Sequence, residues 1–176
     1  MSPPRLALLD RDGTLNRKAP EGDYVTHPGE LELLDGAAEA VRRLNDAAVP
    51  VAVVTNQRAI ALGRLTEPVL AAIHAELERR LAAAGARVDA FYHCPHERGT
   101  CGCRKPEPGL LEAAVRDFGV APADAVMIGD AASDVEAGRR AGTRTVRIGP
   151  GSASAPGPDA DLVAPDLRDA VELVLA

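Results

Sequence analysis

Short apolar runs alternate with amphipathic stretches along almost all of this 176-residue chain. Five apolar runs are rich in β-branched and aliphatic residues, and they lie at 5–9, 51–54, 88–92, 125–128 and 143–148. Apolar residues recur at helical spacing over 36–46, 67–84, 109–118 and 134–141. A further run at 161–164 predicts an edge strand, and 166–175 predicts a last helix that Asp166 caps. The rhythm predicts a three-layer α/β protein, with a doubly wound parallel sheet between helices.

Length and composition indicate one domain over residues 1–176, because the chain is long enough for a sizeable core and shows no shift in composition. The core must be aliphatic, since there are only two Tyr, two Phe and no Trp. Residues 149–158 are Gly, Pro, Ser and Ala, which predicts a loop rather than a linker between domains. The longest irregular insertion is 16–35, directly after the first predicted strand.

The formal net charge of −6 argues against a sequence-independent hold on nucleic acid, which needs a basic face. No apolar run approaches the ~20 residues of a membrane span, so we expect no membrane association. The N-terminal residues also lack the order of a signal peptide. A cytoplasmic protein is the default expectation.

Residues with chemical potential follow four of the predicted strands. They are Asp10 with Asp12, Thr55 to Gln57, Arg104 with Lys105, and Asp130 with Asp134. In open parallel sheets the ligand crevice lies beyond the carboxyl ends of the strands. One crevice is therefore predicted to collect acids, a hydroxyl, amides and cations.

Asp10 and Asp12 flank one residue at the end of the first apolar run. On a strand of period two both side chains project to the same side, so we expect the two carboxylates to converge. Such a pair is tolerable when Mg²⁺ lies between the carboxylates or one of them carries a proton. The alternative is an Asx turn that closes the strand, since Asp and Gly are common there.

Phosphoryl transfer needs a nucleophile, a cation and fixed donors, and this set offers a residue type for each. Asp10 would be the carboxylate nucleophile, and Asp12 would protonate the leaving alkoxide and later deprotonate water. Thr55 would donate its hydroxyl to the phosphoryl group, and Lys105 would offset negative charge.

Asp130 would ligate Mg²⁺, with Asp134 as a second ligand or a support. Each of these residues also has a simpler interpretation on its own: Thr55 and Asn56 as a turn, Lys105 as solvated surface, Asp130 as a helix N-cap. Together, in order and after successive strands, they favour chemistry.

All three cysteines of the chain fall in one short stretch. Cys94, His96, Cys101 and Cys103 supply three thiolates and one imidazole, the complement of a closed tetrahedral Zn²⁺ site. The alternative is reduced thiols with incidental histidines. His93 is the rival nitrogen ligand, but as the neighbour of Cys94 it should point elsewhere if the strand continues. With no ligand to spare, the ion would be structural and would hold Arg104 and Lys105 over the crevice.

Four segments resemble, in order, the motifs of the haloacid dehalogenase (HAD) superfamily phosphatases. They are DRDGTLN, VVTNQ, CRKPEPG and IGDAASD. With the added CPH and CxCRKP patterns, the chain resembles the zinc-containing subgroup of heptose 1,7-bisphosphate 7-phosphatases and histidinol-phosphate phosphatases. The resemblance extends from about residue 6 to residue 142.

That resemblance implies a Rossmann-like sheet, little or no cap domain, and Mg²⁺-dependent hydrolysis through an aspartyl phosphate. It places the nucleophile on Asp10, the acid/base on Asp12, the phosphate contact on Thr55, the charge stabiliser on Lys105 and a metal ligand on Asp130. The family's Mg²⁺ sites also use the backbone carbonyl at the position of Asp12.

The implied substrate is a small phosphorylated sugar, most directly the C7 phosphate of D-glycero-D-manno-heptose 1,7-bisphosphate, and we expect a monomer. Asn56, Gln57 and Arg104 are the predicted substrate contacts. Arg104, and less directly Arg58 and Arg147, suit a second phosphate, although an exposed loop arginine is the preferred interpretation for the last two.

Residues 58–63 read Arg-Ala-Ile-Ala-Leu-Gly where the heptose enzymes usually read Ser-Gly-Ile-Ala-Arg-Gly, and this departure leaves substrate choice open. Histidinol phosphate or another small phosphomonoester is the alternative substrate. A non-catalytic sugar-phosphate-binding protein is the alternative from another class. A signalling receiver domain fits poorly, because its phosphorylated Asp follows the third strand.

Overall fold

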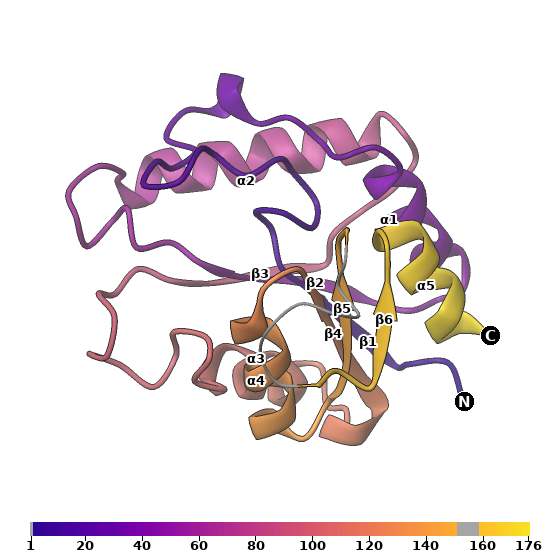
Figure 1. Cartoon of the computed structure of the whole chain (residues 1–176). Helices are drawn as coiled ribbons and strands as arrows, with labels where there is room; N and C mark the ends of the chain where they lie inside the picture. The colour runs from indigo at the N-terminus through magenta and orange to yellow at the C-terminus, as the bar shows by residue number, and fades with distance from the viewer. Residues whose placement is uncertain (1, 151–158) are drawn as a thin grey trace.

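The computed structural model describes residues 2–150 and 159–176. Its centre is a parallel sheet of six strands in the order β3-β2-β1-β4-β5-β6 (Figure 1). The strands are β1 (Leu6–Leu9), β2 (Val51–Asn56), β3 (Ala90–Cys94), β4 (Ala125–Gly129), β5 (Arg144–Ile148) and β6 (Leu162–Ala164). The doubly wound sheet predicted from the apolar runs is confirmed.

Helices cover both faces of the sheet. They are α1 (Ala37–Asp46), α2 (Glu67–Ala82), α3 (Gly109–Asp117), α4 (Ala132–Ala141) and α5 (Leu167–Leu175), with short 3-10 turns η1 (Pro28–Glu30) and η2 (Pro122–Asp124). Figure 1 shows α1, α2 and α5 on one side of the sheet and α3 with α4 on the other. The predicted three layers are therefore present.

The alternation of side chains along β1 explains why the sheet divides the core in two. Ala7 and Leu9 pack in the larger apolar cluster with α1, α2 and α5, whereas Leu6 and Leu8 pack in the smaller one with α3 and α4. All four side chains are fully buried, because a central parallel strand is covered on both faces.

The helices begin and end where local chemistry favours it. In α2 the buried residues Leu70, Ile73, Leu77 and Leu81 recur three or four positions apart and form one apolar stripe. The Asp166 side chain accepts a hydrogen bond from the backbone N–H of Asp169 at 3.0 Å, which confirms the predicted cap of α5. Gly142 ends α4 in the left-handed conformation, where glycine carries no steric penalty.

The bounds of two strands, β2 and β3, differ from the prediction by two residues. β2 continues to Asn56, and β3 starts at Ala90 and runs to Cys94, because the two strands pair in register as far as Asn56 with Cys94. Polar residues therefore occupy the last pairs of the sheet, where an apolar pattern cannot detect them.

Of the predicted 149–158 loop, residues 151–158 lie outside the described residues. The long segment between β1 and α1 carries the turn η1 and an isolated antiparallel bridge between Asn16 and Leu33. No helix in the described ranges combines the length and apolarity needed to cross a membrane. The single-domain organisation remains a prediction.

The order of the strands fixes where a site forms. β1 lies between β2 and β4, and the connections leave it toward opposite edges of the sheet. This reversal is the topological switch point at which open α/β sheets bind their ligands. Asp10 is the first residue after β1, and its backbone N–H still donates to the carbonyl of Ile128 in β4 at 3.0 Å.

Candidate active site

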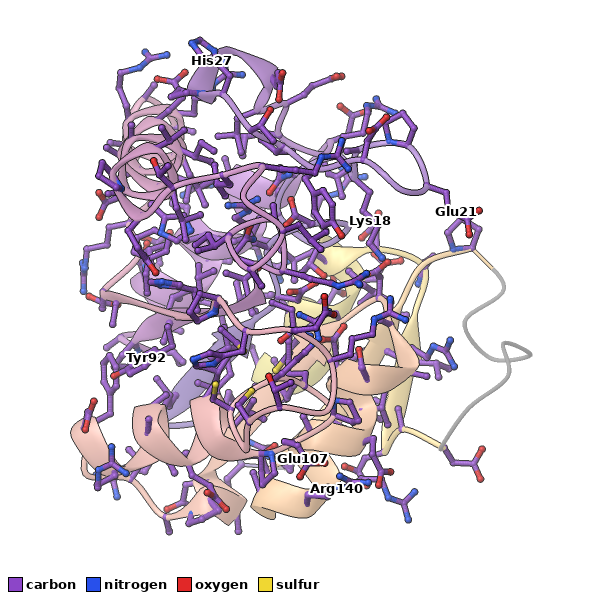
Figure 2. All side chains as sticks on the ribbon, turned by 90° about the vertical axis from the view of Figure 1, so that its left-hand side faces the viewer. Lys18, Glu21, His27, Tyr92, Glu107 and Arg140 are labelled. Carbon is purple, nitrogen blue, oxygen red and sulfur yellow. The ribbon has the colours of Figure 1, made fainter. Side chains whose placement is uncertain are left out.

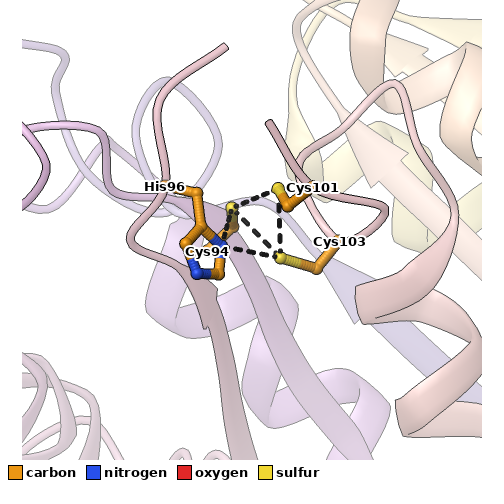
Figure 3. A group of neighbouring side chains, drawn as sticks. All are labelled: Cys94, His96, Cys101 and Cys103. Atoms are coloured by element: carbon orange, nitrogen blue, oxygen red, sulfur yellow. Dashed lines mark hydrogen bonds between the residues drawn. The ribbon is translucent and has the colours of Figure 1, made fainter. Parts of the chain in front are cut away.

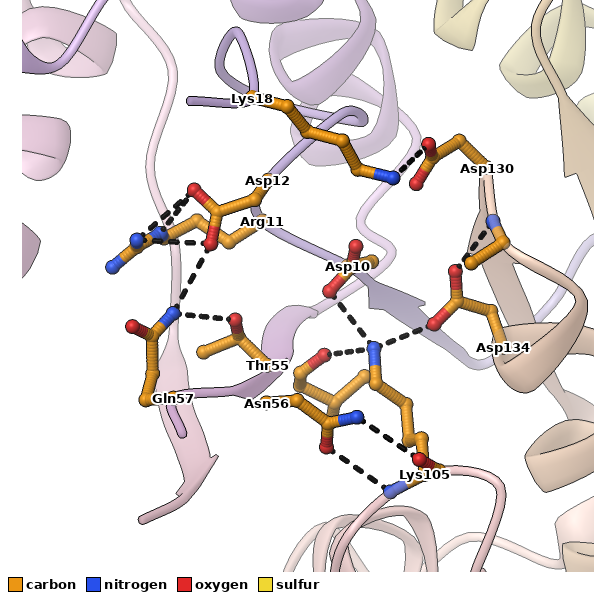
Figure 4. Close-up of polar contacts among 12 residues, drawn as sticks. Asp10, Arg11, Asp12, Lys18, Thr55, Asn56, Gln57, Lys105, Asp130 and Asp134 are labelled. Atoms are coloured by element: carbon orange, nitrogen blue, oxygen red, sulfur yellow. Dashed lines mark hydrogen bonds and ion pairs between the residues drawn. The ribbon is translucent and has the colours of Figure 1, made fainter. Parts of the chain in front are cut away.

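Lys105 and Asp10 form a buried ion pair at the carboxyl end of β1. The Lys105 Nζ lies 2.8 Å from Asp10 Oδ1 and 2.6 Å from Asp134 Oδ1, and it donates to the carbonyl of Val54 at 2.7 Å (Figure 4). Lys105 is only 3% exposed, so its interpretation as solvated surface is wrong. The structure thus brings together residues 95 positions apart, as the strand-end argument predicts.

Burial raises the pKa of Asp10 to about 7, although the Lys105 ammonium opposes that effect. Burial alone would lower the pKa of Lys105, but the charges of Asp10 and Asp134 outweigh it and raise that pKa. Lys105 therefore stays a cation. When Asp10 is ionised, the Lys105 cation faces two carboxylates, and the group is then one cation short of neutrality.

Asp10, Asp130 and Asp134 offer carboxylate oxygens that all lie within 4.8 Å of one another. The Asp130 Oδ1 is buried and has no hydrogen-bond partner among the described residues, while its Oδ2 accepts from the ammonium of Lys18. An unpartnered carboxylate oxygen in an acidic group is the donor that a hard cation needs. These residues therefore fit Mg²⁺.

The backbone leaves room for this group at Gly13, which has φ +97°. A Cβ there would lie 2.6 Å from Asp130 Oδ2, so a larger residue would displace the carboxylate. The close approach explains why the segment turns on a glycine directly after Asp12.

The Asp12 carboxylate does not converge with that of Asp10, contrary to the period-two expectation. It accepts from Asn16 Nδ2 at 2.9 Å and from Gln57 Nε2 at 3.1 Å, and it forms an ion pair with Arg11 (Figure 4). The regular strand ends at Leu9, so period-two alternation no longer holds at Asp12. Its carboxylate is not one of the three that come together, and only its backbone carbonyl remains as the predicted metal ligand.

Gln57 connects Asp12 to Thr55. Its Nε2 donates to Thr55 Oγ1 at 2.9 Å as well as to Asp12 Oδ2. Because the Thr55 oxygen accepts this bond, its own O–H is left to donate, as a phosphate contact requires. Thr55 is 1% exposed and lies within β2, so it is not a turn residue.

Asn56 fixes the loop that carries Lys105. Its Oδ1 accepts from the Lys105 backbone N–H and its Nδ2 donates to the Lys105 carbonyl, both at 3.0 Å. On the other side of this loop Arg140 of α4 pairs with Glu107 at 2.8 Å, and Figure 2 shows the two side chains together. Lys105 is therefore held from both sides.

A cavity of about 530 Å³ adjoins Lys105. Asn56, Arg98, Arg104 and Ser133 are among its lining residues. The Arg104 Nη1 is buried and has no hydrogen-bond partner in the part of the chain that the structure describes. Two guanidinium groups at this cavity favour an anion, because planar forks suit phosphate oxygens.

The other two arginines considered for a second phosphate differ from Arg104. Arg58 pairs with Glu97 through Nε–Oε1 at 2.5 Å and Nη2–Oε2 at 3.0 Å. Arg147 lies in β5 and is 9% exposed, so its interpretation as an exposed loop arginine is wrong.

The structure brings together the side chains of the four predicted zinc ligands, Cys94, His96, Cys101 and Cys103 (Figure 3). The Cys103 Sγ lies 3.2 Å from Cys94 Sγ, 3.4 Å from Cys101 Sγ and 3.3 Å from His96 Nδ1. Two thiolates about 2.3 Å from one tetrahedral Zn²⁺ would be roughly 3.8 Å apart, so the arrangement suits that ion. His93 points away from the cluster, to Glu67 at 2.8 Å, as expected.

Two further residues contact the site carboxylates, and the sequence motifs do not predict either contact. Lys18 contacts Asp130, and Arg11, which is fully buried, contacts Asp12. Lys18 lies in the irregular segment after β1, where no periodic pattern predicts which way a side chain points. For Arg11, the sequence does offer a signal: it is a charged residue between two acids.

Comparisons with known proteins agree on one family. The family described as HAD-hydrolase-like matches residues 102–170. The D-glycero-α-D-manno-heptose-1,7-bisphosphate 7-phosphatase of Mycobacterium tuberculosis is 41% identical over 131 residues, which are 73% of this chain and 68% of that protein. The β-anomer enzyme of Pseudomonas aeruginosa is 34% identical over 175 residues, 97% of each chain. A crystal structure of the Bordetella bronchiseptica heptose 1,7-bisphosphate phosphatase with magnesium and phosphate superposes with a TM-score of 0.89 at 34% identity, over 97% of this chain and 98% of that one.

Proposed function

The chain belongs to the D-glycero-D-manno-heptose-1,7-bisphosphate 7-phosphatase family of HAD-like hydrolases, and we propose that its acidic site hydrolyses the C7 phosphate of that sugar. The observation that carries the proposal is the buried Lys105 ammonium between Asp10 and Asp134, beside an unpartnered oxygen of Asp130. This arrangement supplies a nucleophile together with the charges that surround a phosphoryl group.

Asp10 is the proposed nucleophile. Its carboxylate attacks phosphorus, the bond from phosphorus to the sugar oxygen breaks, and Asp12 donates a proton to that oxygen. Water then attacks the phosphorus of the aspartyl phosphate, with Asp12 taking the water's proton, and free phosphate leaves as the Asp10 carboxylate is restored. Atoms and charges balance over the two steps.

Thr55 and Lys105 hold the transferring group. The Thr55 hydroxyl donates to a phosphoryl oxygen, because its own oxygen already accepts from Gln57. Lys105 offsets the negative charge of nucleophile and phosphate. Asp10, Asp130, Asp134 and the backbone carbonyl of Asp12 would hold Mg²⁺, which supplies neutralisation of the phosphoryl oxygens. The magnesium and phosphate of the Bordetella relative support this assignment.

The sugar and its second phosphate are proposed to extend into the cavity beside Lys105. Arg104 contributes a buried guanidinium nitrogen without a partner there, and Asn56 lines the same cavity. Arg58 is excluded from the phosphate contacts in this proposal, because its guanidinium already binds the Glu97 carboxylate through two hydrogen bonds. Zn²⁺ at Cys94, His96, Cys101 and Cys103 would fix the loop that leads into Arg104. One chain supplies all these residues, which supports a monomer as the working unit.

Phosphate release in the presence of Mg²⁺ tests the proposal. The panel contains both anomers of heptose 1,7-bisphosphate, fructose 1,6-bisphosphate and histidinol phosphate, with Asp10→Asn as the control. We expect the highest kcat/KM on one heptose anomer and no release by the variant. Equal rates on all four compounds would keep a phosphatase and reject the heptose assignment.

A further inference from the structure

Arg11 lies between the two motif carboxylates and is fully buried. Within the described residues, its side-chain hydrogen bonds all end on Asp12: Nε to Oδ1 at 3.3 Å, and Nη2 to Oδ1 at 3.0 Å and Oδ2 at 2.9 Å. Its Nη1 is buried and has no hydrogen-bond partner in residues 2–150 or 159–176. A guanidinium has five N–H donors, enough to bind several acceptors at once. This one directs every bond that it makes to a single carboxylate.

Backbone hydrogen bonds fix the position of Arg11 itself. The Arg11 carbonyl accepts from the backbone N–H of Leu15 at 2.9 Å and of Asn16 at 3.1 Å, so the residue is anchored at the head of the turn. Asn16 and Gln57 add one neutral donor each to the Asp12 carboxylate. Of the three described side chains that donate to Asp12, Arg11 is the charged one and binds both oxygens.

His74 is a neighbour of Arg11 close enough to feel its charge. His74 of α2 is buried and stacks on Phe91 with the ring centroids 4.4 Å apart. Burial, and after it the charge of Arg11, lowers the pKa of His74 to about 3. The imidazole is therefore neutral in the folded protein and adds no charge repulsion against the guanidinium.

We propose that Arg11 is the positioning residue for Asp12, fixing the place and orientation of the carboxyl group that protonates the leaving oxygen. The inference rests on the proposed function. When the phosphorus–oxygen bond breaks, its electron pair stays on the sugar oxygen, and the Asp12 proton moves there. Loss of the proton leaves Asp12 as a carboxylate, which the Arg11 guanidinium binds at both oxygens. The guanidinium thereby keeps this carboxylate in place to take the proton of the water in the second step.

A change of leaving group tests this role. A sugar alkoxide needs a proton to leave, whereas nitrophenolate and acetate do not, and kcat/KM reports the steps up to formation of the aspartyl phosphate. We would measure kcat/KM for heptose 1,7-bisphosphate and for p-nitrophenyl phosphate or acetyl phosphate. The enzymes are wild type, Arg11→Met, Arg11→Lys and Asp12→Asn, and the two Arg11 variants in the Asp12→Asn background.

Arg11→Met is expected to lower kcat/KM for the heptose bisphosphate about 10- to 100-fold, and for the activated phosphate less than about threefold, because only the first needs the acid. Arg11→Lys should recover part of the loss, since it restores charge without the fork. In the Asp12→Asn background the ratio between the two substrates should not change further.

Equal losses on both substrates, or full activity in a folded Arg11→Met, would overturn the inference. Urea unfolding and circular dichroism show whether each variant folds. If Arg11→Met does not fold, Arg11→Lys and Gln57→Leu carry the comparison, and Gln57→Leu should change the ratio less because the fork remains. Failure of the proposed function looks different: wild type would then release no phosphate from the heptose bisphosphate.

Discussion

The side-chain amide of Asn56 pairs with the backbone of Lys105 at both the N–H and the carbonyl, at 3.0 Å each. This places the end of β2 and the loop after the cysteine cluster in one rigid unit. The Lys105 ammonium is consequently delivered to Asp10 from a loop that has no regular secondary structure of its own.

Asn56→Ala should therefore affect catalysis through Lys105. Losing both bonds leaves two backbone groups of Lys105 without these partners, and we expect a loss of about 1–3 kcal/mol in the free energy of unfolding. We also expect kcat to fall about tenfold or more as the ammonium loses its position. Asn56→Asp keeps an acceptor for the N–H and should lie between wild type and Asn56→Ala. An unchanged kcat in Asn56→Ala would contradict the account.

Zinc and activity should be lost together in Cys101→Ser, because the cluster fixes the loop that contains Arg104 and Lys105. Zinc content by atomic absorption and phosphate release with Mg²⁺ present measure the two quantities. Thr100→Ser, a neighbouring change that leaves the ligands intact, is the matched control and should keep both. Full activity in zinc-free protein would show that the loop holds its shape without the ion.

Arg58 and Glu97 should couple only weakly in a double-mutant cycle. Their side chains are 30% and 40% exposed, so solvent screens the pair, and we expect a small coupling energy that decreases with added salt. Arg58→Ser and Glu97→Gln, alone and combined, supply the cycle in urea unfolding. Because the guanidinium is engaged by Glu97, the KM of Arg58→Ser for the heptose bisphosphate should change less than about threefold. A rise of tenfold would indicate that Arg58 binds substrate.

His74 should make the fold sensitive to acid. Burial, followed by the charge of Arg11, lowers its pKa from 6.5 to about 3, so at pH 5 the unfolded chain binds a proton that the folded chain does not. Stability from this group is present at neutral pH and is lost as pH falls below the unfolded pKa, by about 2 kcal/mol between pH 7 and pH 5.

His74→Phe, which keeps a ring against Phe91, removes this proton uptake. Urea unfolding of both proteins at the two pH values gives the difference, and effects of pH on the cysteine cluster cancel because both proteins share it. The variant should lose about 2 kcal/mol less than wild type on going to pH 5. The same loss in both proteins would mean that His74 is protonated in the folded state.

The apolar runs predicted the sheet, its layers and the meeting of Asp10, Lys105 and Asp130, because parallel strands end at a common edge. They did not predict that β2 and β3 continue through polar pairs to Asn56 and Cys94, since pairing in a sheet is decided by backbone register. Nor did they place the Asp12 carboxylate. Its direction depends on the turn after β1 and on donors such as Gln57, 45 residues away. Irregular segments have no periodic spacing of residues, so a sequence pattern cannot predict the contacts that they make.

The most direct measurement is an acid quench of single turnover with heptose 1,7-bisphosphate labelled in its C7 phosphate, followed by peptide mapping. The account predicts transient label on the peptide that contains Asp10, accompanied by release of the same phosphate, and neither label nor release in Asp10→Asn. Steady release from wild type with no labelled peptide, or turnover in Asp10→Asn at the wild-type rate, would contradict it.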